Sequence, residues 1–208
     1  MGTTSQPPGE QKTNIHFLKP QQVEAMRDAA HEGRHGQRDD AIVTLLYDCG
    51  LRRTELSAVD RGMLDLADGV LRLPTHIQKD YPTEGSPDPA TVELDPENDL
   101  RTERTLRSFL STRDDDSPAL FPSRKADRMT GKGINDVVKR LADRADVRPH
   151  TFAARGDSGD VTAHTLRHSV AYRMLHTYDG YTLYNVRNRL RHSRLATTER
   201  KYDHFDTV

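Results

Sequence analysis

The apolar residues of this 208-residue chain recur at helical spacing over most of its length, and one stretch breaks the pattern. Residues 21–30 and 39–49 each carry an apolar stripe, and Gly50 is a natural stop for the second. A short helix is expected from residue 54. Residues 69–94 instead read as strands around a Pro- and Gly-rich loop. The pattern predicts a mainly α fold with a small three-stranded antiparallel β-sheet, an α+β class.

The helical pattern returns after residue 100. The expected helices cover residues 104–111, 130–145, 162–173, 181–190 and 197–204. Thr130 and Thr162 begin two of them, and a threonine hydroxyl there can cap a helix N-terminus. In the second of these helices, an apolar stripe predicts the inward-facing side chains Ile134, Val137, Val138 and Leu141.

Several classes of protein do not fit the sequence. Cys49 is the one cysteine, so no intrachain disulfide or cysteine-based zinc site is expected. No apolar run approaches the roughly 18 residues that span a bilayer, and the polar N-terminus does not resemble a signal peptide. We therefore expect a soluble, cytoplasmic protein without membrane contacts. Its residues 1–17 are expected to form a flexible polar tail and residues 18–208 one domain.

The charged residues are unusual in kind although their sum is only −1. The sequence contains 24 Arg against 7 Lys and 23 Asp against 9 Glu. Such an excess of Asp with few Lys resembles the proteins of extreme halophiles, a haloarchaeon for example, and a GC-rich genome explains it equally well. Against an acidic proteome, a net charge of −1 is relatively basic. The net charge therefore does not exclude a nucleic-acid partner.

Four stretches concentrate residues that could act on an anion. They are G-L-R-R-T-E-L with Arg52 and Glu55, the region of Lys79 at the expected end of a strand, H-T-L-R-H from His164 to His168, and L-R-H-S-R-L-A-T-T-E-R-K-Y from Leu190 to Tyr202. Each has an ordinary explanation: a helix ion pair, a solvated lysine, or structural histidines. Yet three cationic side chains on one helix face need a negative partner, which is either a carboxylate of this protein or an external phosphate.

A metal site is the other interpretation of the histidines. The sequence offers no carboxylate or cysteine at ligand spacing beside them, and the nearby arginines repel a cation. No metal or other cofactor is therefore expected.

The order and spacing of the four stretches resemble the catalytic domain of the tyrosine recombinase (phage integrase, Xer-like) family. The resemblance covers roughly residues 18–205 and includes A-L-F-P-S and M-T-G-K-G-I-N-D-V-V-K-R-L-A between the second and third stretches. It implies a site-specific DNA recombinase or integrase that cleaves and rejoins double-stranded DNA without metal or ATP. It also implies a homotetramer on the DNA as the assembly.

The resemblance assigns a role to each position. Tyr202 matches the nucleophile that forms a 3′-phosphotyrosyl bond. Arg52 and Arg167 match the two arginines that grip the non-bridging phosphate oxygens, for which a planar guanidinium is well suited.

The remaining positions follow in the same way. His164 and His192 match the histidines that hydrogen-bond the phosphate and help to manage the proton of the nucleophile. Lys79 matches the lysine that protonates the leaving 5′-oxygen. Glu55 and His168 match secondary positions, which we expect to orient the arginines and support the pocket.

The chain departs from the family pattern in four places. Arg191 stands where the family usually has glycine before the histidine, which is expected to shift His192. The interval from His192 to Tyr202 is one residue longer than usual, and one residue rotates a helical side chain by about 100°. The short N-terminal segment predicts a chain without the family's N-terminal DNA-clamping domain, and the six residues after Tyr202 are too few for the C-terminal helix that family members often exchange between protomers. We therefore expect a catalytic domain alone, either naturally minimal or a fragment, with weak DNA binding.

Other functions remain open on the sequence. The first two departures favour a DNA-binding regulator, or an accessory to a recombinase, that has lost its chemistry. A type IB topoisomerase shares the tyrosine chemistry, but the small size and the motif details fit a recombinase better. A helical protein that binds acidic partners would leave the ordered motifs as coincidence.

Overall fold

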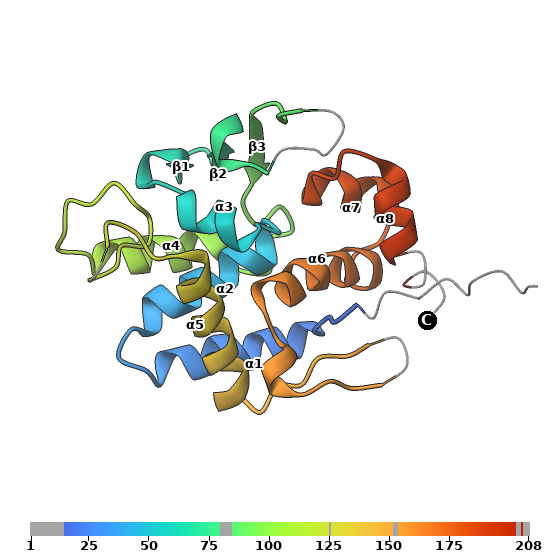
Figure 1. The fold of residues 1–208 in the computed structure, drawn as a ribbon, viewed down its shortest axis with the longest axis horizontal. Coiled ribbons are helices and arrows are strands. Elements are labelled where there is room, and N and C mark those ends of the chain that lie inside the picture. Colours follow the sequence, from blue (N-terminus) through green and yellow to red (C-terminus); the bar gives the residue numbers. More distant parts are fainter. Residues whose placement is uncertain (1–14, 80–84, 125, 152–153, 203–204, 206–208) are drawn as a thin grey trace, which may run out of the picture.

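The computed structural model describes residues 15–79, 85–124, 126–151, 154–202 and 205 of the chain (Figure 1). In chain order the elements are α1 (Pro20–His31), α2 (Gly36–Asp48), α3 (Arg53–Ala58), the 3₁₀ turn η1 (Arg61–Met63), β1 (Leu64–Asp65), β2 (Val70–Leu73), η2 (Thr75–Ile77), β3 (Ala90–Glu93), α4 (Thr102–Ser111), α5 (Gly131–Arg144), η3 (Ser158–Asp160), α6 (Ala163–Thr177), α7 (Leu183–Leu190) and α8 (Leu195–Tyr202).

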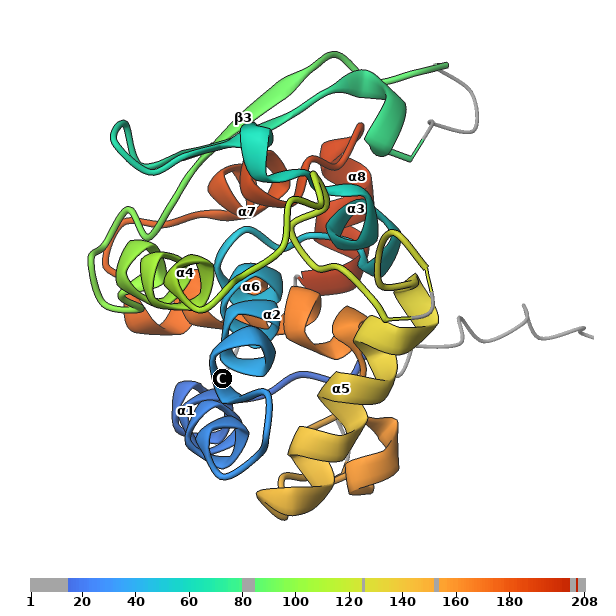
Figure 2. The same ribbon diagram turned by 90° about the vertical axis from the view of Figure 1, so that its left-hand side faces the viewer.

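Helix α2 runs through the core of the molecule. All of its residues from Asp39 to Asp48 are buried, and α1, α4, α5 and α6 pack around it (Figures 1 and 2). Its apolar stripe, which includes Ile42, Leu45 and Leu46, is fully buried, as the helical spacing predicts. The C-terminal end of α2 is thereby fixed in the interior, where the first of the four stretches begins.

The three strands form one antiparallel sheet in the order β1-β2-β3. Leu71 of β2 lies opposite Leu64 and Val92, and the sheet forms a layer at one end of the helical body (Figure 2). The predicted α+β class with a small antiparallel sheet is confirmed. The first strand lies before residue 69, however, and so precedes the stretch that the sequence pattern indicated.

Lys79 does not lie at the end of a strand, which corrects the sequence-based expectation. Strand β2 ends at Leu73, and η2 follows before the chain reaches Lys79. Pro74, which directly precedes η2, lacks the N–H that a continued strand would use. Residues 80–84 of the expected loop lie outside the described residues.

Both predicted threonine caps are present. Thr130 Oγ1 accepts a hydrogen bond of 3.1 Å from the backbone N–H of Gly133, at the start of α5. Thr162 Oγ1 accepts one of 3.2 Å from the N–H of Thr165, at the start of α6. The four inward-facing residues predicted in α5 are buried. These contacts fix where α6, which carries the third stretch, begins.

The N-terminal boundary expected at residue 18 lies inside a packed segment. Ile15 and Phe17 are only 4% and 9% exposed, and they belong to a small apolar cluster that also contains Tyr202 and Phe205. Residues 1–14 lie outside the described residues. Among the helices that the structure describes, none is long and apolar enough to cross a membrane.

Candidate active site

Arg167 lies at the centre of the candidate site. It extends from α6, is 2% exposed, and donates hydrogen bonds from Nη1 to the carbonyl oxygen of Gly50 and from Nη2 to that of Leu190. One side chain thus joins the α2–α3 junction to the C-terminal end of α7. Burial, together with the charges of Arg52 and Arg191, lowers the pKa of Arg167 to about 9, so the guanidinium keeps its charge at neutral pH.

Gly50 makes this junction possible. Its φ of +58° lies in the left-handed region, and a Cβ built on it would be 2.6 Å from Cδ2 of Leu190. A glycine is therefore required both by the backbone conformation and by the close approach of α7. The turn presents the carbonyl oxygen of Gly50 to Arg167.

Replacing Gly50 with alanine is expected to lower the free energy of unfolding by about 2–3 kcal/mol, since the left-handed strain and the clash with Leu190 add together. Urea unfolding monitored by circular dichroism measures the change. Gly180→Ala, at φ +81° in open space, isolates the cost of the backbone, and Gly62→Ala is a control with nothing within 4 Å of the new Cβ. A Gly50→Ala cost no larger than that of Gly180→Ala would show that the approach of Leu190 adds nothing.

Glu55 binds two other arginines, Arg52 and Arg191, in the neighbourhood of Arg167. Its Oε1 accepts from Arg52 Nη1 at 2.6 Å, and its Oε2 accepts from the Arg52 backbone N–H at 2.8 Å and from Arg191 Nη2 at 2.9 Å. Burial raises the pKa of this carboxyl, but Arg191, Arg167 and Arg52 together hold it below the usual value. The fully buried carboxylate therefore carries a negative charge among three guanidinium groups.

Tyr202 is fully buried at the end of α8. Its hydroxyl lies 2.6 Å from Nδ1 of His168, and its ring stacks on that of Phe205 at 5.6 Å. Burial raises the pKa of Tyr202 far above its usual value, against the opposing effect of Arg167. The phenol is consequently protonated and shielded from solvent, and a reaction with an external phosphate requires that this hydroxyl become accessible.

His168 is thus the direct neighbour of the tyrosine hydroxyl. The sequence comparison assigned it only a supporting position. Burial and the neighbouring His164, Lys201, Arg167 and His192 lower the pKa of His168 well below its usual value, so the ring is neutral at neutral pH. A neutral imidazole can accept the phenolic proton, provided that the tautomer leaves Nδ1 unprotonated.

Arg52, Lys79 and His164 line one open groove of about 810 Å³ between α3, η2, α5 and the start of α6. Arg53 also borders it, and none of its described lining residues carries a carboxylate. A second hollow on the other side of His164 is lined by His168 and Lys201, and also by Asp160. The groove therefore presents positive charge and hydrogen-bond donors, as the phosphate backbone of a nucleic acid requires.

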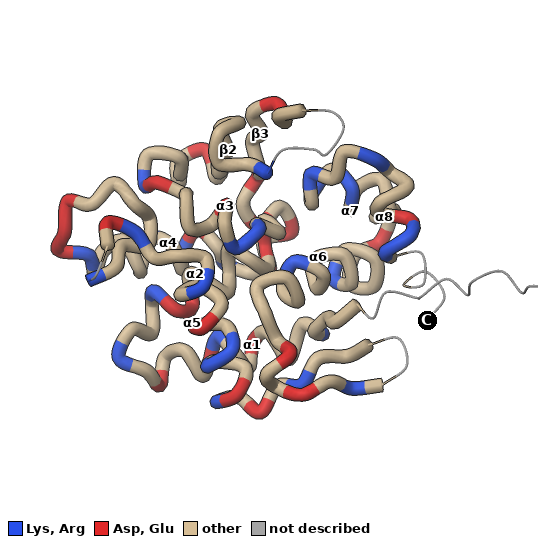
Figure 3. Tube along the Cα trace, in the orientation of Figure 1, with Lys and Arg blue, Asp and Glu red and all other residues tan. Residues whose placement is uncertain are grey.

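Basic residues of α3, α6, α7 and α8 border the same part of the molecule, whereas basic and acidic residues are mixed beside α4 and around α1 (Figure 3). This arrangement accounts for how a chain with a net charge of −1 can present a cationic groove. The distribution of charge, rather than its sum, decides which partner the surface can bind.

His192 follows α7 and faces Tyr202. Its Nδ1 lies 2.9 Å from Thr198 Oγ1, and its ring is nearly parallel to that of Tyr202 at 6.3 Å between centroids. Burial, followed by the charges of Arg167 and Lys201, lowers the pKa of His192 to about 3. Partial desolvation and the charges of Lys201, Arg167 and Arg52 lower that of His164 to about 4. Both rings are neutral at neutral pH.

These neutral histidines predict a loss of stability in acid. Between pH 6.5, the usual pKa of histidine, and the lowered pKa of about 3, the unfolded chain binds a proton at His192 that the folded chain does not. The stability that the folded chain gains from the neutral His192 ring is therefore complete above pH 6.5 and is lost as the pH falls below that value. Urea unfolding at several pH values between about 7 and 5 gives the free energy of unfolding as a function of pH. The slope of this dependence should be smaller by about 1 kcal/mol per pH unit in His192→Gln than in wild type. Equal slopes in the two proteins would contradict a lowered pKa of His192 in the folded chain.

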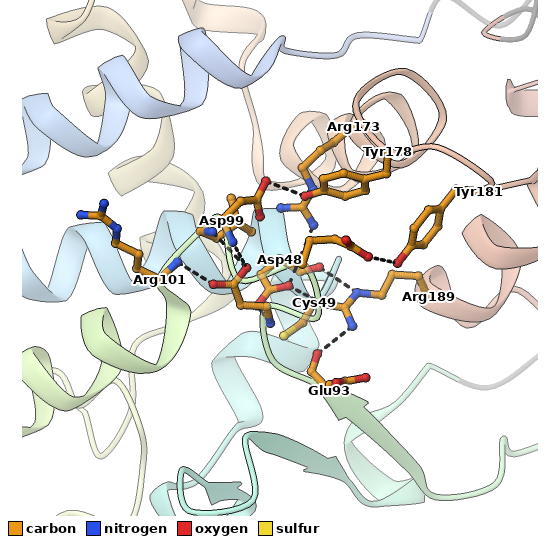
Figure 4. A network of polar contacts seen from close by, with 12 residues as sticks. Asp48, Cys49, Glu93, Asp99, Arg101, Arg173, Tyr178, Tyr181 and Arg189 are labelled. Carbon is orange, nitrogen blue, oxygen red and sulfur yellow. Dashed lines mark hydrogen bonds and ion pairs between the residues drawn. The ribbon is translucent and has the colours of Figure 1, made fainter.

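A buried polar network holds α7 in place behind the site (Figure 4). Arg189 donates to the carboxylate of Asp48, to the Asp48 carbonyl oxygen at 3.0 Å and to the Glu93 carbonyl oxygen at 2.7 Å. Asp48 is fully buried, and Arg173 lies 3.9 Å from its carboxylate. The network joins α7 to α2 and β3, and so fixes Leu190 and the turn that follows it.

The structure brings Arg52, Glu55, His164, Arg167, His168, His192 and Tyr202 together around one site and places Lys79 on the rim of the adjoining groove.

Sequence reasoning missed the contribution of Thr198, although it belongs to the paired threonines of the fourth stretch. It also missed Lys201 and the Asp48–Arg189 pair, whose partners are 141 residues apart and carry no local signal. The described residues contain no group of three His, Cys, Asp or Glu that could hold a metal ion.

Comparison with known proteins gives one consistent result. The profile of the Phage integrase family matches residues 16–207. The chain is similar to tyrosine recombinase XerC of Herpetosiphon aurantiacus, with 32% identity over 169 residues, 80% of this chain and 48% of that protein. It is similar to tyrosine recombinase XerD of Pseudomonas putida, with 33% identity over 187 residues, 88% of this chain and 55% of that protein. The chain spans about half the length of the curated relatives it matches.

Two solved structures share the fold. The crystal structure of XerA recombinase superimposes with a TM-score of 0.69 at 23% identity, over 94% of this chain and 61% of that chain. XerH recombinase bound to a palindromic difH substrate gives 0.69 at 19% identity, over 96% of this chain and 52% of that chain. The likeness extends over nearly all of the chain.

Proposed function

Because the chain belongs to the phage integrase family, we propose that it is the catalytic part of a site-specific recombinase that breaks and rejoins DNA through Tyr202. The observation that carries the proposal is the position of Arg167, whose guanidinium joins Gly50 of the first stretch to Leu190 of the fourth. Segments far apart in the chain thereby meet around one cationic site with a tyrosine beside it.

In the proposed reaction the Tyr202 oxygen attacks the phosphorus of a DNA phosphodiester, and the bond from phosphorus to the 5′-oxygen breaks. The phenolic proton passes to His168, its neighbour at 2.6 Å, and the leaving 5′-oxygen takes up a proton from Lys79. The product is a 3′-phosphotyrosyl bond, which a 5′-hydroxyl of another strand can attack in the reverse sense. The phosphodiester bond energy is retained, so ATP is not required.

The cationic residues have separate tasks in this proposal. Arg52 and Arg167 stabilise the negative charge that builds up on the non-bridging oxygens. His164 and His192 donate hydrogen bonds to the same oxygens as neutral imidazoles, in keeping with their lowered pKa values. Glu55 orients Arg52 through their 2.6 Å ion pair. With these donors in place the reaction needs no metal.

Double-stranded DNA is the proposed partner, and residues 18–208 are the proposed catalytic domain. The similar structure of the Tn1549 transposon integrase is a complex with transposon right end DNA, and the carboxylate-free lining of the groove beside Arg52 and Lys79 suits a phosphate backbone in this chain. Assembly as a homotetramer on DNA is part of the same proposal.

One observation favours a second candidate. Tyr202 is fully buried, so its hydroxyl cannot reach a phosphate without rearrangement of α8. A DNA-binding regulator that has lost its chemistry would have the same buried tyrosine. The two functions differ in whether DNA becomes covalently attached.

Covalent trapping tests the proposal. Nicked duplexes that release a short 5′-hydroxyl fragment after cleavage cannot be rejoined, so an adduct accumulates and migrates slowly on a denaturing gel. The duplexes are drawn from DNA flanking the gene and from a random pool, across a wide range of salt because phosphate-driven affinity falls steeply with ionic strength. An adduct supports the recombinase. DNA binding without an adduct under any condition supports the regulator.

A further inference from the structure

Arg191 occupies a backbone position that few residues adopt. It follows the last residue of α7 with φ 52° and ψ 49°, in the left-handed region where the resemblance assigns glycine. Its backbone thus makes the expected tight turn at a cost of about 1 kcal/mol relative to glycine. Such strain persists only where the surrounding contacts favour it.

The contacts of the Arg191 side chain supply that compensation. Its side chain is only 8% exposed, and Nη2 donates to Glu55 Oε2 at 2.9 Å. Nη1 donates to the carbonyl oxygens of Cys49 and Arg189, each at 3.1 Å. The turn before His192 is therefore tied both to the end of α2 and to α3, which a glycine could not do.

The same contact determines how Glu55 is shared. The Arg52 guanidinium binds Oε1 of Glu55, and Oε2 is shared by the Arg52 backbone N–H and the Arg191 guanidinium. Of the charges around Glu55, that of Arg191 has the largest effect in keeping the carboxylate ionised. Arg167 lies near enough to be attracted to this carboxylate, yet it is held by the carbonyl oxygens of Gly50 and Leu190. Without Arg191, Oε2 of Glu55 would keep only the Arg52 backbone N–H as a partner, and its negative charge would be left to attract Arg167.

We propose that Arg191 is a positioning residue for DNA cleavage: by binding Glu55, it keeps Arg167 available to the phosphate and holds the turn that carries His192. This inference rests on the proposed function. Three guanidinium groups around one carboxylate leave an excess of positive charge where an anion is to bind. Removing Arg191 lets Glu55 neutralise Arg167, so transition-state stabilisation falls more than DNA affinity does.

Three substitutions distinguish charge from space filling. Arg191→Gln keeps much of the side-chain volume and removes the charge, Arg191→Lys keeps the charge, and Arg191→Gly restores the usual family residue and relieves the backbone. Arg104→Gln, on the exposed side of α4, is the matched control. Each protein is first shown to be folded by circular dichroism.

Single-turnover cleavage of the nicked duplex at several DNA concentrations gives the maximal rate and the apparent affinity separately. We expect Arg191→Gln and Arg191→Gly to lower the maximal rate by roughly 10- to 100-fold with an affinity within about threefold of wild type. Arg191→Lys should remain within about fivefold of the wild-type rate. A wild-type rate for Arg191→Gly would overturn the proposal, since glycine would then serve as well.

A second measurement does not depend on cleavage. The ring of His192 is faced by Arg167 from α6, Lys201 and Tyr202 from α8, and Arg52 at the start of α3, besides Arg191 itself. Burial is the largest cause of the low pKa of His192 and Arg191 only one of several charges, so the ring is followed by NMR from about pH 7 down to the lowest pH at which circular dichroism shows the proteins folded. Protonation should begin at a higher pH in Arg191→Gln than in wild type or Arg191→Lys. Identical titrations in all three would contradict the electrostatic part of the proposal.

The two measurements separate the possible failures. No wild-type adduct, with DNA binding intact, refutes the proposed function and with it any role of Arg191 in cleavage, while the NMR titration still decides whether Arg191 sets the charge at His192. A wild-type adduct together with unimpaired Arg191→Gln and Arg191→Gly refutes the positioning role alone.

Discussion

Replacing Tyr202 with phenylalanine is expected to abolish the covalent protein–DNA adduct, with a loss of at least about 10³-fold in trapped product. The substitution removes one oxygen, the atom that the proposed mechanism bonds to phosphorus. The ring keeps its place among Phe205 and the other members of the apolar cluster, so DNA affinity should stay within about twofold of wild type. Trapping on nicked duplexes and a gel-shift titration measure the two quantities.

The matched control is Tyr184→Phe, because Tyr184 is 57% exposed on α7 and lies outside the cluster around Tyr202. It should form adduct at the wild-type level. Loss of the hydrogen bond to His168 is expected to cost about 1 kcal/mol of stability in Tyr202→Phe, which urea unfolding can verify. Adduct formation by Tyr202→Phe equal to that of wild type would refute Tyr202 as the nucleophile.

Replacing Arg167 with alanine is expected to have the second largest effect, on activity and on stability together. Cleavage should fall by about 10²- to 10³-fold, since a preorganised donor to the phosphate is lost. The free energy of unfolding should fall by about 3–5 kcal/mol, because the buried bonds to Gly50 and Leu190 are lost and Glu55 loses a neighbouring charge.

Activity and stability have to be measured separately for this variant. Cleavage is compared at a temperature where circular dichroism shows both proteins folded, and urea unfolding gives the stability. Arg167→Lys keeps the charge but cannot span both carbonyl oxygens, so it should lie between alanine and wild type in both measurements. Arg104→Ala on α4 serves as the control. Full cleavage by folded Arg167→Ala would exclude Arg167 as a phosphate ligand.

Helical spacing and local capping were sufficient to predict most of the elements. The buried stripe of α2 and the caps at Thr130 and Thr162 are properties of residues three or four apart, which a sequence displays directly. The place of Lys79 was predicted wrongly, because β2 ends at Leu73 and a 3₁₀ turn follows. Short strands carry few residues, so their ends are poorly defined by alternation alone.

The candidate site, like the fold, was predicted from the sequence only in part. The motifs identified which side chains gather there, and the structure adds how they are connected. Nothing near His168 in the sequence shows that its Nδ1 meets the hydroxyl of Tyr202, 34 residues later. That contact depends on the packing of α7 against α6 and of α8 against α7, a long-range arrangement whose distances no local pattern contains.

The sequence by itself determined most of the helices, the class of fold, and most of the residues that gather at the site, because each depends on short-range spacing or on ordered motifs. Only the tertiary structure decided that Tyr202 is buried, and that Arg191 takes a left-handed turn and shares Glu55 with Arg52. The physical reason is that burial, pKa and ion pairing depend on distances between segments. Arg191 and Glu55 are 136 residues apart in the chain and 2.9 Å apart in space.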